Sequence, residues 1–440
     1  CLIYITKLYM SRNQSQQLFE GKHAMSEAWI IDAVRTPRGI GKVGKGALAH
    51  LHPQVLGATV LRALAERNGL NTADVGDICW GTAVQRGQQG SNLGRNSALL
   101  AGYDVRASGM TLDRACGSSI SSVVLAAGQI KSGFEDCAIG GGTDMMSFHT
   151  TAFQEEAAAG LGVGPGAGNP DLVALHPLSH QGVCADAIAA LEGITRVDVD
   201  ALGLESQRRA KIAMDEGRFG DSVVPVHNPD GTLALAHDEF PRPDTTAAGL
   251  AALRASFDGL AHMAAQADGT TYRQMIQRKY PRLEWQGIHH AGNSSGVVDG
   301  SAAVLLASPA YAKAQGWKPR ARIVTAVNMG DCPTLMLNAP VPAARRALER
   351  AGLGVGDIDV WEINEAFAVV AEKFQRDLGM DRSKVNINGG AIALGHPIGA
   401  TGALLIGTAL DELERSGGRY GLITMCAAGG MAPAVIIERI

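Results

Sequence analysis

The stretch Leu61-Arg-Ala-Leu-Ala-Glu-Arg-Asn-Gly-Leu70 recurs far along the chain as Ala344-Arg-Arg-Ala-Leu-Glu-Arg-Ala-Gly-Leu353. Each copy predicts an amphipathic helix that ends at a glycine, Gly69 in the first copy and Gly352 in the second. An aspartate-led turn into an apolar strand follows each helix. The repeat therefore predicts an α/β unit that is built twice in one chain.

The strands expected to enter the two units also match. Ala28-Trp-Ile-Ile-Asp-Ala-Val-Arg35 corresponds to Ala321-Arg-Ile-Val-Thr-Ala-Val-Asn328, and in both copies this strand precedes the helix. Chance similarity between short alanine-rich helices is the alternative, and two matches in the same order argue against it. Strands that alternate with helices indicate an α/β fold with mixed, mostly parallel sheets.

The segment between the two units has a different character. It contains a glycine-rich stretch from Gly160 to Gly168 and several polar connectors, which predict an inserted loop domain. After it, Gly300-Ser-Ala-Ala-Val-Leu-Leu-Ala307 returns to a strand pattern and is expected to rejoin the first unit. The expected boundaries are 25–147 plus 297–319 for the N-terminal half, 148–296 for the loop domain and 320–440 for the C-terminal half.

Residues 1–24 differ from the rest of the sequence, and we expect a disordered extension upstream of a natural start at Met25. The segment Cys1–Met10 is apolar, but it has neither a basic start nor a small-residue cleavage site. A signal peptide is therefore the weaker interpretation.

Composition narrows the class of function. The 440 residues carry a formal net charge of −4, which gives no broad attraction to nucleic acid or to an anionic membrane. No run approaches the roughly 20 apolar residues of a membrane-spanning helix. Seven cysteines without a CxxC pair argue against a disulfide framework and a zinc site, and for a reducing compartment. We therefore expect a cytoplasmic protein without a metal.

One glycine pattern invites a different interpretation. Gly39-Ile-Gly41-Lys-Val-Gly44 fits GxGxxG and stands one residue short of a P-loop, because Gly46 follows Lys45 where Ser or Thr is required. A dinucleotide site needs its glycines at a tight turn from strand to helix, and the next helix is expected only near Pro53. A flexible basic loop is the preferred interpretation.

The first chemically suggestive cluster is Asp113-Arg-Ala-Cys116-Gly-Ser-Ser-Ile120. A turn of small residues precedes an amphipathic run, so Cys116 is expected at or near a helix N-terminus. The free N–H groups there favour a thiolate and lower its pKa. A thiolate attacks a thioester carbonyl, and the same N–H groups can hold the resulting oxyanion. A buried, inert cysteine is the alternative.

A second cluster is Asn388-Gly-Gly-Ala-Ile-Ala-Leu-Gly-His396-Pro-Ile-Gly-Ala-Thr-Gly402, with a histidine at a glycine-rich turn before a helix. Shifted by the offset of the helix repeat, Cys116 falls beside this turn. The internal symmetry is therefore expected to bring two helix N-termini together, where His396 could activate the cysteine. A structural turn histidine is the alternative.

Two further clusters follow predicted strands. Cys426 comes after the apolar run Gly421–Met425 and precedes a glycine pair, where a second thiol could act as acid and base. Asn364 stands in Trp361-Glu-Ile-Asn364-Glu365-Ala-Phe-Ala368, where its amide could donate to a bound water or a carbonyl oxygen. A purely structural helix cap is the alternative interpretation of Asn364.

These four clusters, in this order and spacing, resemble those of the thiolase family over about residues 28–440. The resemblance implies duplicated α/β halves in a layered α-β-α-β-α arrangement with an inserted loop domain. It implies an acyltransferase that cleaves 3-ketoacyl-CoA or condenses acetyl-CoA through a Cys116 acyl-enzyme. It also implies acyl-CoA substrates, no covalently bound cofactor, and a homodimer or homotetramer.

Carried over residue by residue, the resemblance assigns a role to each cluster. Cys116 is acylated, His396 takes the thiol proton, and His396 polarises the thioester oxygen together with a water held by Asn364. Cys426 moves the proton of the acetyl methyl group. The N–H groups of Cys116 and Ala428 form a second oxyanion hole.

The resemblance also implies contacts with coenzyme A and shows some departures. Gly292-Asn-Ser-Ser-Gly296 is similar to a loop against the pantetheine arm, which suggests Ser295 and Gly296 as contacts, and Arg242 is aligned with the adenine end. The late motif has Ala428 where the family usually has glycine, and Gln181 stands where many members have methionine. These departures affect the acyl substrate and leave the reaction class unchanged.

Two alternatives remain. A ketoacyl-synthase-type condensing enzyme shares the expected fold and a cysteine nucleophile, but its site resembles Cys with two His, or His and Asn, and lacks an acid/base cysteine such as Cys426. A catalytically inactive CoA- or lipid-binding relative is expected to lose Cys116, His396 or Cys426, and all three are present.

Overall fold

The computed structural model describes residues 27–150, 169–266 and 268–440. The expected extension over 1–24 and the glycine-rich stretch Gly160–Gly168 lie outside these residues. One mixed ten-stranded sheet dominates the described chain, and a short hairpin forms a second sheet. In the large sheet the neighbours run in the order β10-β11-β12-β9-β1-β8-β5-β3-β4, and β2 pairs with β8.

The strands fall into three groups along the chain. Those of the N-terminal half are β1 (Trp29–Arg35), β2 (Gly39–Ile40), β3 (Asp77–Gly81), β4 (Met110–Leu112), β5 (Cys137–Met145) and β8 (Val298–Ala307). Those of the C-terminal half are β9 (Ala321–Gly330), β10 (Val360–Ile363), β11 (Tyr420–Thr424) and β12 (Met431–Arg439). The hairpin is β6 (Val226–His227) with β7 (Leu233–Leu235).

The helices divide in the same way. The N-terminal half carries α2 (Pro53–Asn68), α3 (Leu93–Ala101), α4 (Ser118–Ser132) and α12 (Pro309–Ala314). The C-terminal half carries α13 (Pro340–Ala351), α14 (Ala368–Leu378), α15 (Ala391–Leu394) and α16 (Thr401–Ser416). Between them lie α6 (Pro170–Leu175), α7 (Gln181–Glu192), α8 (Arg196–Asp215), α9 (Ala247–Ala251), α10 (Asp258–Ala261) and α11 (Tyr272–Gln277).

The sheet repeats one pattern of pairing in its two halves. The series β1-β8-β5-β3 pairs antiparallel, antiparallel and then parallel, and β9-β12-β11-β10 does the same. Within each series one strand, β8 or β12, runs against all the others. The predicted α/β fold with duplicated halves and mixed sheets of mostly co-directional strands is therefore confirmed. The reversed strand makes its own pairings antiparallel.

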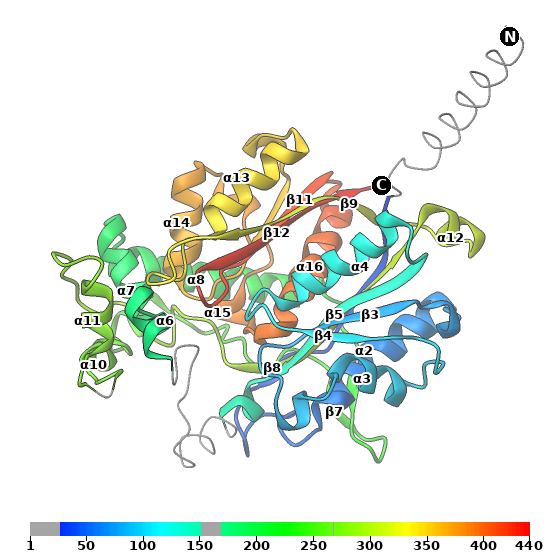
Figure 1. The fold of residues 1–440 in the computed structure, drawn as a ribbon, viewed down its shortest axis with the longest axis horizontal. Helices are drawn as coiled ribbons and strands as arrows, with labels where there is room; N and C mark the ends of the chain where they lie inside the picture. The colour runs from blue at the N-terminus through cyan, green and yellow to red at the C-terminus, as the bar shows by residue number, and fades with distance from the viewer. Residues whose placement is uncertain (1–26, 151–168, 267) are drawn as a thin grey trace, which may run out of the picture.

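The two halves join through a short seam. β1 pairs with β9 only through Trp29 with Arg322 and Ile30 with Ala321. On either side of this seam the half-sheets pack against a shared central layer formed by α4 and α16 (Figure 1). The helices α2 and α3 cover the outer face of the first half-sheet, and α13 and α14 cover that of the second (Figure 1). This is the α-β-α-β-α order that the resemblance implied.

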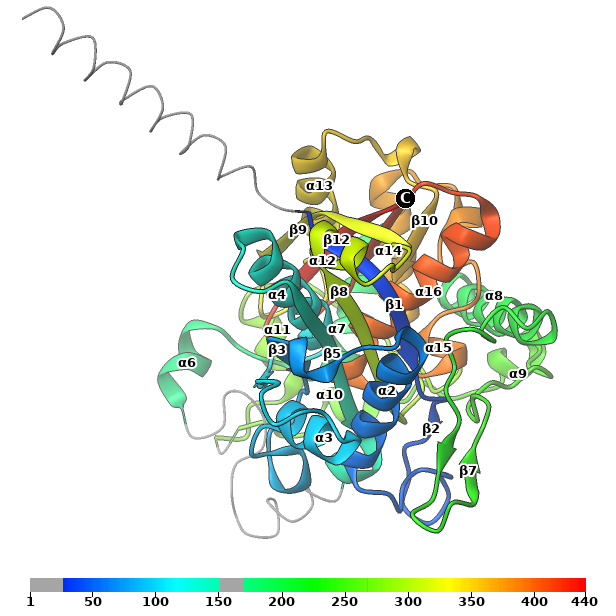
Figure 2. The same ribbon diagram turned by 90° about the vertical axis from the view of Figure 1, so that its right-hand side faces the viewer.

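The repeated sequence that predicted the duplication forms α2 and α13. Their C-caps, Gly69 and Gly352, have φ angles of 55° and 66°. A side chain is disfavoured in this left-handed conformation, which explains why both copies stop at glycine. The helices α7 and α8 from the intervening segment pack on α14, and α8 also contacts α15 (Figure 2).

The glycine pattern after β1 does not open a helix. Gly39 and Ile40 form β2, turns follow, and α2 begins only at Pro53. The carboxylate of Glu239 accepts the N–H groups of Ile40 and Ala47 and so holds this loop in place. The loop therefore lacks the helix N-terminus that a phosphate site on this motif requires. Among the described helices, none is long and apolar enough to cross a membrane.

Candidate active site

Cys116 and His396 precede the two central helices, whose first turns touch. Ala403 at the start of α16 donates its N–H to Ser119 Oγ at 2.9 Å. A Cβ on Gly402 would lie 2.3 Å from the backbone nitrogen of Ile120, so only glycine allows this approach. The internal symmetry thus brings the two helix N-termini together, as the repeat predicted.

Cys116 is held in a tight turn and is 6% exposed. Ala115 before it has a φ of 48°, uncommon for a residue other than glycine. The backbone N–H groups of Cys116 and Ala428 face the Cys116 sulfur and favour its thiolate. Burial, followed by the carboxylate of Asp144, nevertheless raises the pKa of the thiol to about 12. The expectation of a lowered pKa was wrong, because desolvation outweighs the N–H groups.

Cys426 lies beside this thiol. It follows β11 and is 1% exposed, and a turn closed by backbone hydrogen bonds between Ala427 and Met431 carries Ala428 at its tip. Burial raises the pKa of Cys426, and charge on Cys116 raises it further. Two thiols and the Ala428 N–H therefore share one enclosed space. Ala428 stands where the family usually has glycine, and its backbone N–H is still directed at the Cys116 sulfur.

His396 completes the group from the α16 side. Its Nδ1 is 2.6 Å from Thr401 Oγ1, and its Nε2 is 3.4 Å from Asn364 Nδ2. Because the amide nitrogen donates, Nε2 accepts and the ring proton lies on Nδ1, facing Thr401. Burial lowers the pKa of His396 to about 4, while Asp144 opposes that shift. The imidazole is therefore neutral and ready to accept a proton at Nε2.

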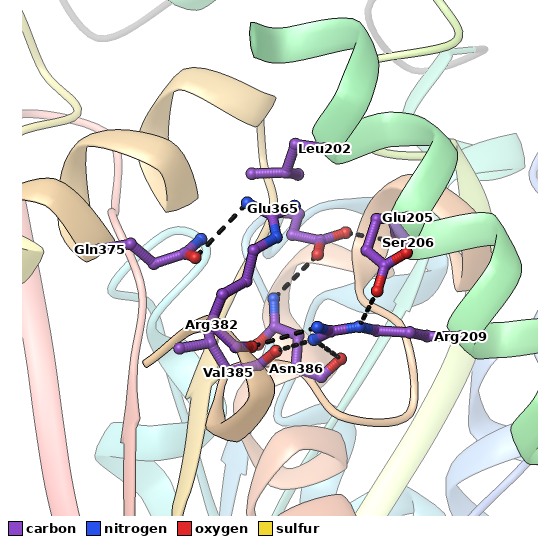
Figure 3. A pocket seen from close by; sticks show the side chains of 9 residues that line it. All are labelled: Leu202, Glu205, Ser206, Arg209, Glu365, Gln375, Arg382, Val385 and Asn386. Carbon is purple, nitrogen blue, oxygen red and sulfur yellow. Dashed lines mark hydrogen bonds and ion pairs between the residues drawn. The ribbon is translucent and has the colours of Figure 1, made fainter. Parts of the chain in front are cut away.

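Asn364 and Glu365 point in different directions from the end of β10. The Asn364 N–H donates to Thr424 O at the end of β11, which places the amide beside His396. The Glu365 carboxylate accepts from Ser206 Oγ at 2.7 Å and Asn386 Nδ2 at 2.9 Å. Figure 3 shows these partners in a polar crevice where α8 meets the C-terminal half. Glu365 thus anchors the site without entering it.

Of the residues expected to contact coenzyme A, Gly296 lies next to His396. The Gly296 carbonyl accepts the His396 N–H at 2.9 Å, and the Ser295 N–H donates to Ala366 O. A Cβ on Gly296 would lie 2.2 Å from the ring of Phe240. The exposed guanidinium of Arg242 lies over the same ring, with its Cζ 5.7 Å from the centroid. Gly296 and Arg242 thus both lie against Phe240, and Ser295 precedes Gly296 in the same loop.

Sequence reasoning missed two residues that organise this site. Thr401 Oγ1 bonds Nδ1 of His396 and holds the ring in place; its signal was a hydroxyl five positions after the histidine in the glycine-rich turn. Asp144, at the end of β5, accepts hydrogen bonds from the Gly399 N–H, the Thr82 hydroxyl and the Gln89 side-chain amide. A buried acid in an apolar strand was its only sequence signal. Within 27–150, 169–266 and 268–440, no cluster of His, Cys, Asp or Glu could hold a metal ion.

If Cys116 is acylated as the resemblance implies, its acylation by acetyl-CoA is expected to fall at low pH with a midpoint near 4 and not near the ordinary 6.5. The buried His396 stays neutral above its lowered pKa and gains a proton only below it, when it can no longer accept the thiol proton. Rapid-quench mass spectrometry from about pH 3 to 8 measures the rate on both sides of that midpoint, and circular dichroism verifies that the protein remains folded. A midpoint near 6.5 would refute the buried neutral imidazole.

A buried thiol faced by two backbone N–H groups has a second thiol beside it, and a neutral imidazole precedes the neighbouring central helix. This arrangement suits one class of protein, an acyl-transfer enzyme on a duplicated α/β fold. The thiolase N-terminal domain profile matches residues 28–270, and the thiolase C-terminal domain profile matches residues 317–439. The chain belongs to the thiolase family and is an acyltransferase.

Individual relatives agree with this assignment. The chain is 39% identical to a β-ketoadipyl-CoA thiolase of Acinetobacter baylyi, covering 94% of this chain and 100% of that one. It is 39% identical to a steroid 3-ketoacyl-CoA thiolase of Mycobacterium tuberculosis, covering 94% and 95%. The crystal structure of a Bacillus anthracis acetyl-CoA acetyltransferase superposes with a TM-score of 0.79 at 32% identity, covering 95% and 100%. Neither the ketoacyl-synthase nor the inactive-relative alternative is favoured by these matches.

Proposed function

We propose that this thiolase works by a ping-pong mechanism in which Cys116 carries the acyl group. In the cleavage direction, Nε2 of His396 takes the Cys116 proton and the thiolate attacks the 3-keto carbon. The bond between C2 and C3 breaks, and Cys426 gives its proton to the departing acetyl-CoA carbanion. Coenzyme A then gives its thiol proton to the Cys426 thiolate and attacks the acyl-enzyme, His396 returns its proton to the departing Cys116, and the shortened acyl-CoA is released. Synthesis reverses these steps.

The observation that carries this proposal is the Ala428 N–H facing the Cys116 sulfur. With the N–H of Cys116 itself, it forms a pair of donors at the place where the oxyanion of an acyl-cysteine develops. On the other side, the Nε2–H that His396 carries once it has taken the Cys116 proton, and a water held by Asn364, would donate to the thioester oxygen of the partner molecule. Two separate oxyanion sites suit a reaction that joins or separates two thioesters.

The substrates proposed are 3-ketoacyl-CoA thioesters, with coenzyme A as substrate and product and no metal or covalent cofactor. Ser295, Gly296 and Arg242 are the proposed coenzyme A contacts within the loop domain and at its end. An aromatic group supports an acyl site there: Phe257 lies 5.7 Å from both the His180 and Phe367 rings. This chemistry fits β-oxidation and related pathways of fatty acid metabolism.

We also propose a homodimer or homotetramer in the cytoplasm. Among the described strands, β4 stands at the edge of the sheet, and Met110 on it and Val105 before it are 38% and 75% exposed. An apolar unpaired edge is suited to pairing with a second copy. The six described cysteines are free thiols, which suits a reducing compartment. Sedimentation velocity of the purified chain measures the assembly directly.

The test is a coenzyme A-dependent cleavage assay over 3-ketoacyl-CoA substrates of several lengths, including 3-oxoadipyl-CoA and a bulky ring-containing chain. Mass spectrometry should detect acetyl-CoA and an acyl-CoA shortened by two carbons in equal amounts. Initial rates with both substrates varied should give parallel double-reciprocal lines. Product formation without coenzyme A, or no turnover with any chain, would reject the proposal.

A further inference from the structure

A small cavity lies beside Asn364, bordered by residues of β10, α15 and α16. Four of the residues that line it matter here: Arg38, Glu362, Asn364 and Thr401. The first three are 4%, 1% and 1% exposed. Both carboxyl oxygens of Glu362, Nε of Arg38 and Oδ1 of Asn364 find no hydrogen-bond partner among the described protein groups. Four such atoms around one cavity indicate a site built for water.

The chemistry of these atoms is complementary. Burial, followed by the charges of Glu365 and Glu412, raises the pKa of Glu362 well above its usual range, so its acid form is favoured and can donate a proton in a hydrogen bond. The Arg38 Nε–H is a second donor, and the Asn364 Oδ1 is an acceptor. Water has two donors and two acceptors, so it can link all three groups.

We propose that Glu362 and Arg38 are positioning residues that orient the Asn364 amide through water held in this shared cavity. The proposal rests on the oxyanion role given to Asn364 above. An amide can present either its oxygen or its nitrogen to a neighbour. When a cavity water donates to Oδ1, Nδ2 is turned toward Nε2 of His396, which lies 3.4 Å away.

The same cavity reaches His396 by two other routes. Thr401, which bonds Nδ1 of His396 at 2.6 Å, lines the cavity with its neighbours. Arg38 Nη1 donates to the carbonyl of Gly395, the residue before His396, at 3.2 Å. The cavity therefore borders both proposed partners of the oxyanion site, Asn364 directly and His396 through Thr401 and Gly395.

The test compares Glu362→Leu with the conservative Glu362→Gln. Leucine removes both polar atoms, and we expect deuterium exchange at the methyl group of acetyl-CoA to slow about tenfold or more. kcat should fall with it while KM for acetyl-CoA stays within about twofold, because Asn364 acts on the reacting oxygen and not on the coenzyme A arm. Glutamine keeps a donor and an acceptor and should restore exchange to within about threefold.

A double-mutant cycle separates positioning from a general loss of stability. If Glu362 acts through Asn364, Glu362→Leu should cause little further loss in an Asn364→Ala background. Losses that multiply would overturn the proposal, as would full activity of Glu362→Leu. If wild type itself fails to exchange or cleave, the proposed function falls instead. Should Glu362→Leu not fold, a high-resolution crystal structure of the wild type decides, since a dry cavity overturns the proposal and bridging waters support it.

Discussion

Replacing Cys116 by Ala is expected to lower both cleavage and synthesis by about 10⁴-fold or more, the scale seen when a covalent nucleophile is removed. The methyl side chain of this variant cannot accept an acyl group, and the other thiol of the site, Cys426, lacks the N–H of Ala428 at its sulfur. The substitution deletes a single sulfur from a turn shaped by Ala115 and the α4 terminus. Binding of acyl-CoA should therefore survive.

Intact-protein mass spectrometry after incubation with acetyl-CoA measures the acyl-enzyme, and steady-state assays measure turnover. Cys137→Ala is the matched control, because Cys137 is a fully buried cysteine at the start of β5 in the outer core of the N-terminal half. That control should acylate and turn over within about threefold of wild type. An acetyl group that persists on the Cys116→Ala protein, or turnover close to wild type, would show that another group is the nucleophile.

The parts of the fold that the sequence predicted are those that depend on local chemistry. The stop of α2 at Gly69 and of α13 at Gly352 follows from one backbone conformation that glycine tolerates best. The apolar run around Gly300–Ala307 has a strand pattern, and forms β8. The pairing of β1 with β9 through two residue pairs carried no such signal. Nothing in either sequence shows whether the strand pairs with the other half-sheet or remains an unpaired edge.

For the site, motifs pointed to the residues that we propose to react, but not to the groups that set their pKa values and orientation. Asp144 and Gly399 are 255 positions apart in the sequence, and the Asp144 carboxylate accepts the Gly399 N–H. No local sequence pattern predicts that contact. The pKa of Cys116 was predicted with the wrong sign because the helix N-terminus is visible in a sequence and burial is not. Both errors come from long-range packing. The roles of Cys116, His396, Asn364 and Cys426 remain predictions that the variants test.

Replacing Cys426 by Ala is expected to separate two halves of the reaction that wild type performs together. Acylation of Cys116 by acetyl-CoA should persist, because the thiol, its N–H donors and His396 are untouched. Exchange of the acetyl methyl protons, and with it condensation, should fall by about 10²- to 10⁴-fold, the usual contribution of a general acid or base. Cys426→Ser should behave like Cys426→Ala, since a buried hydroxyl is a much weaker acid than a thiol.

Nuclear magnetic resonance in D₂O follows the methyl exchange, and mass spectrometry follows the acyl-enzyme in the same samples. Cys79→Ala, a buried thiol on β3 that hydrogen-bonds Asp77, is the control and should leave both readings unchanged. If Cys426→Ala lost acylation as well, Cys426 would be needed for the acylation of Cys116, and a specific role in transferring the methyl proton would be refuted. If Cys426→Ala kept both activities, another residue would transfer the methyl proton. That result would favour the ketoacyl-synthase-type alternative, whose site lacks an acid/base cysteine. Only loss of exchange with retained acylation assigns the two thiols of this site to separate steps.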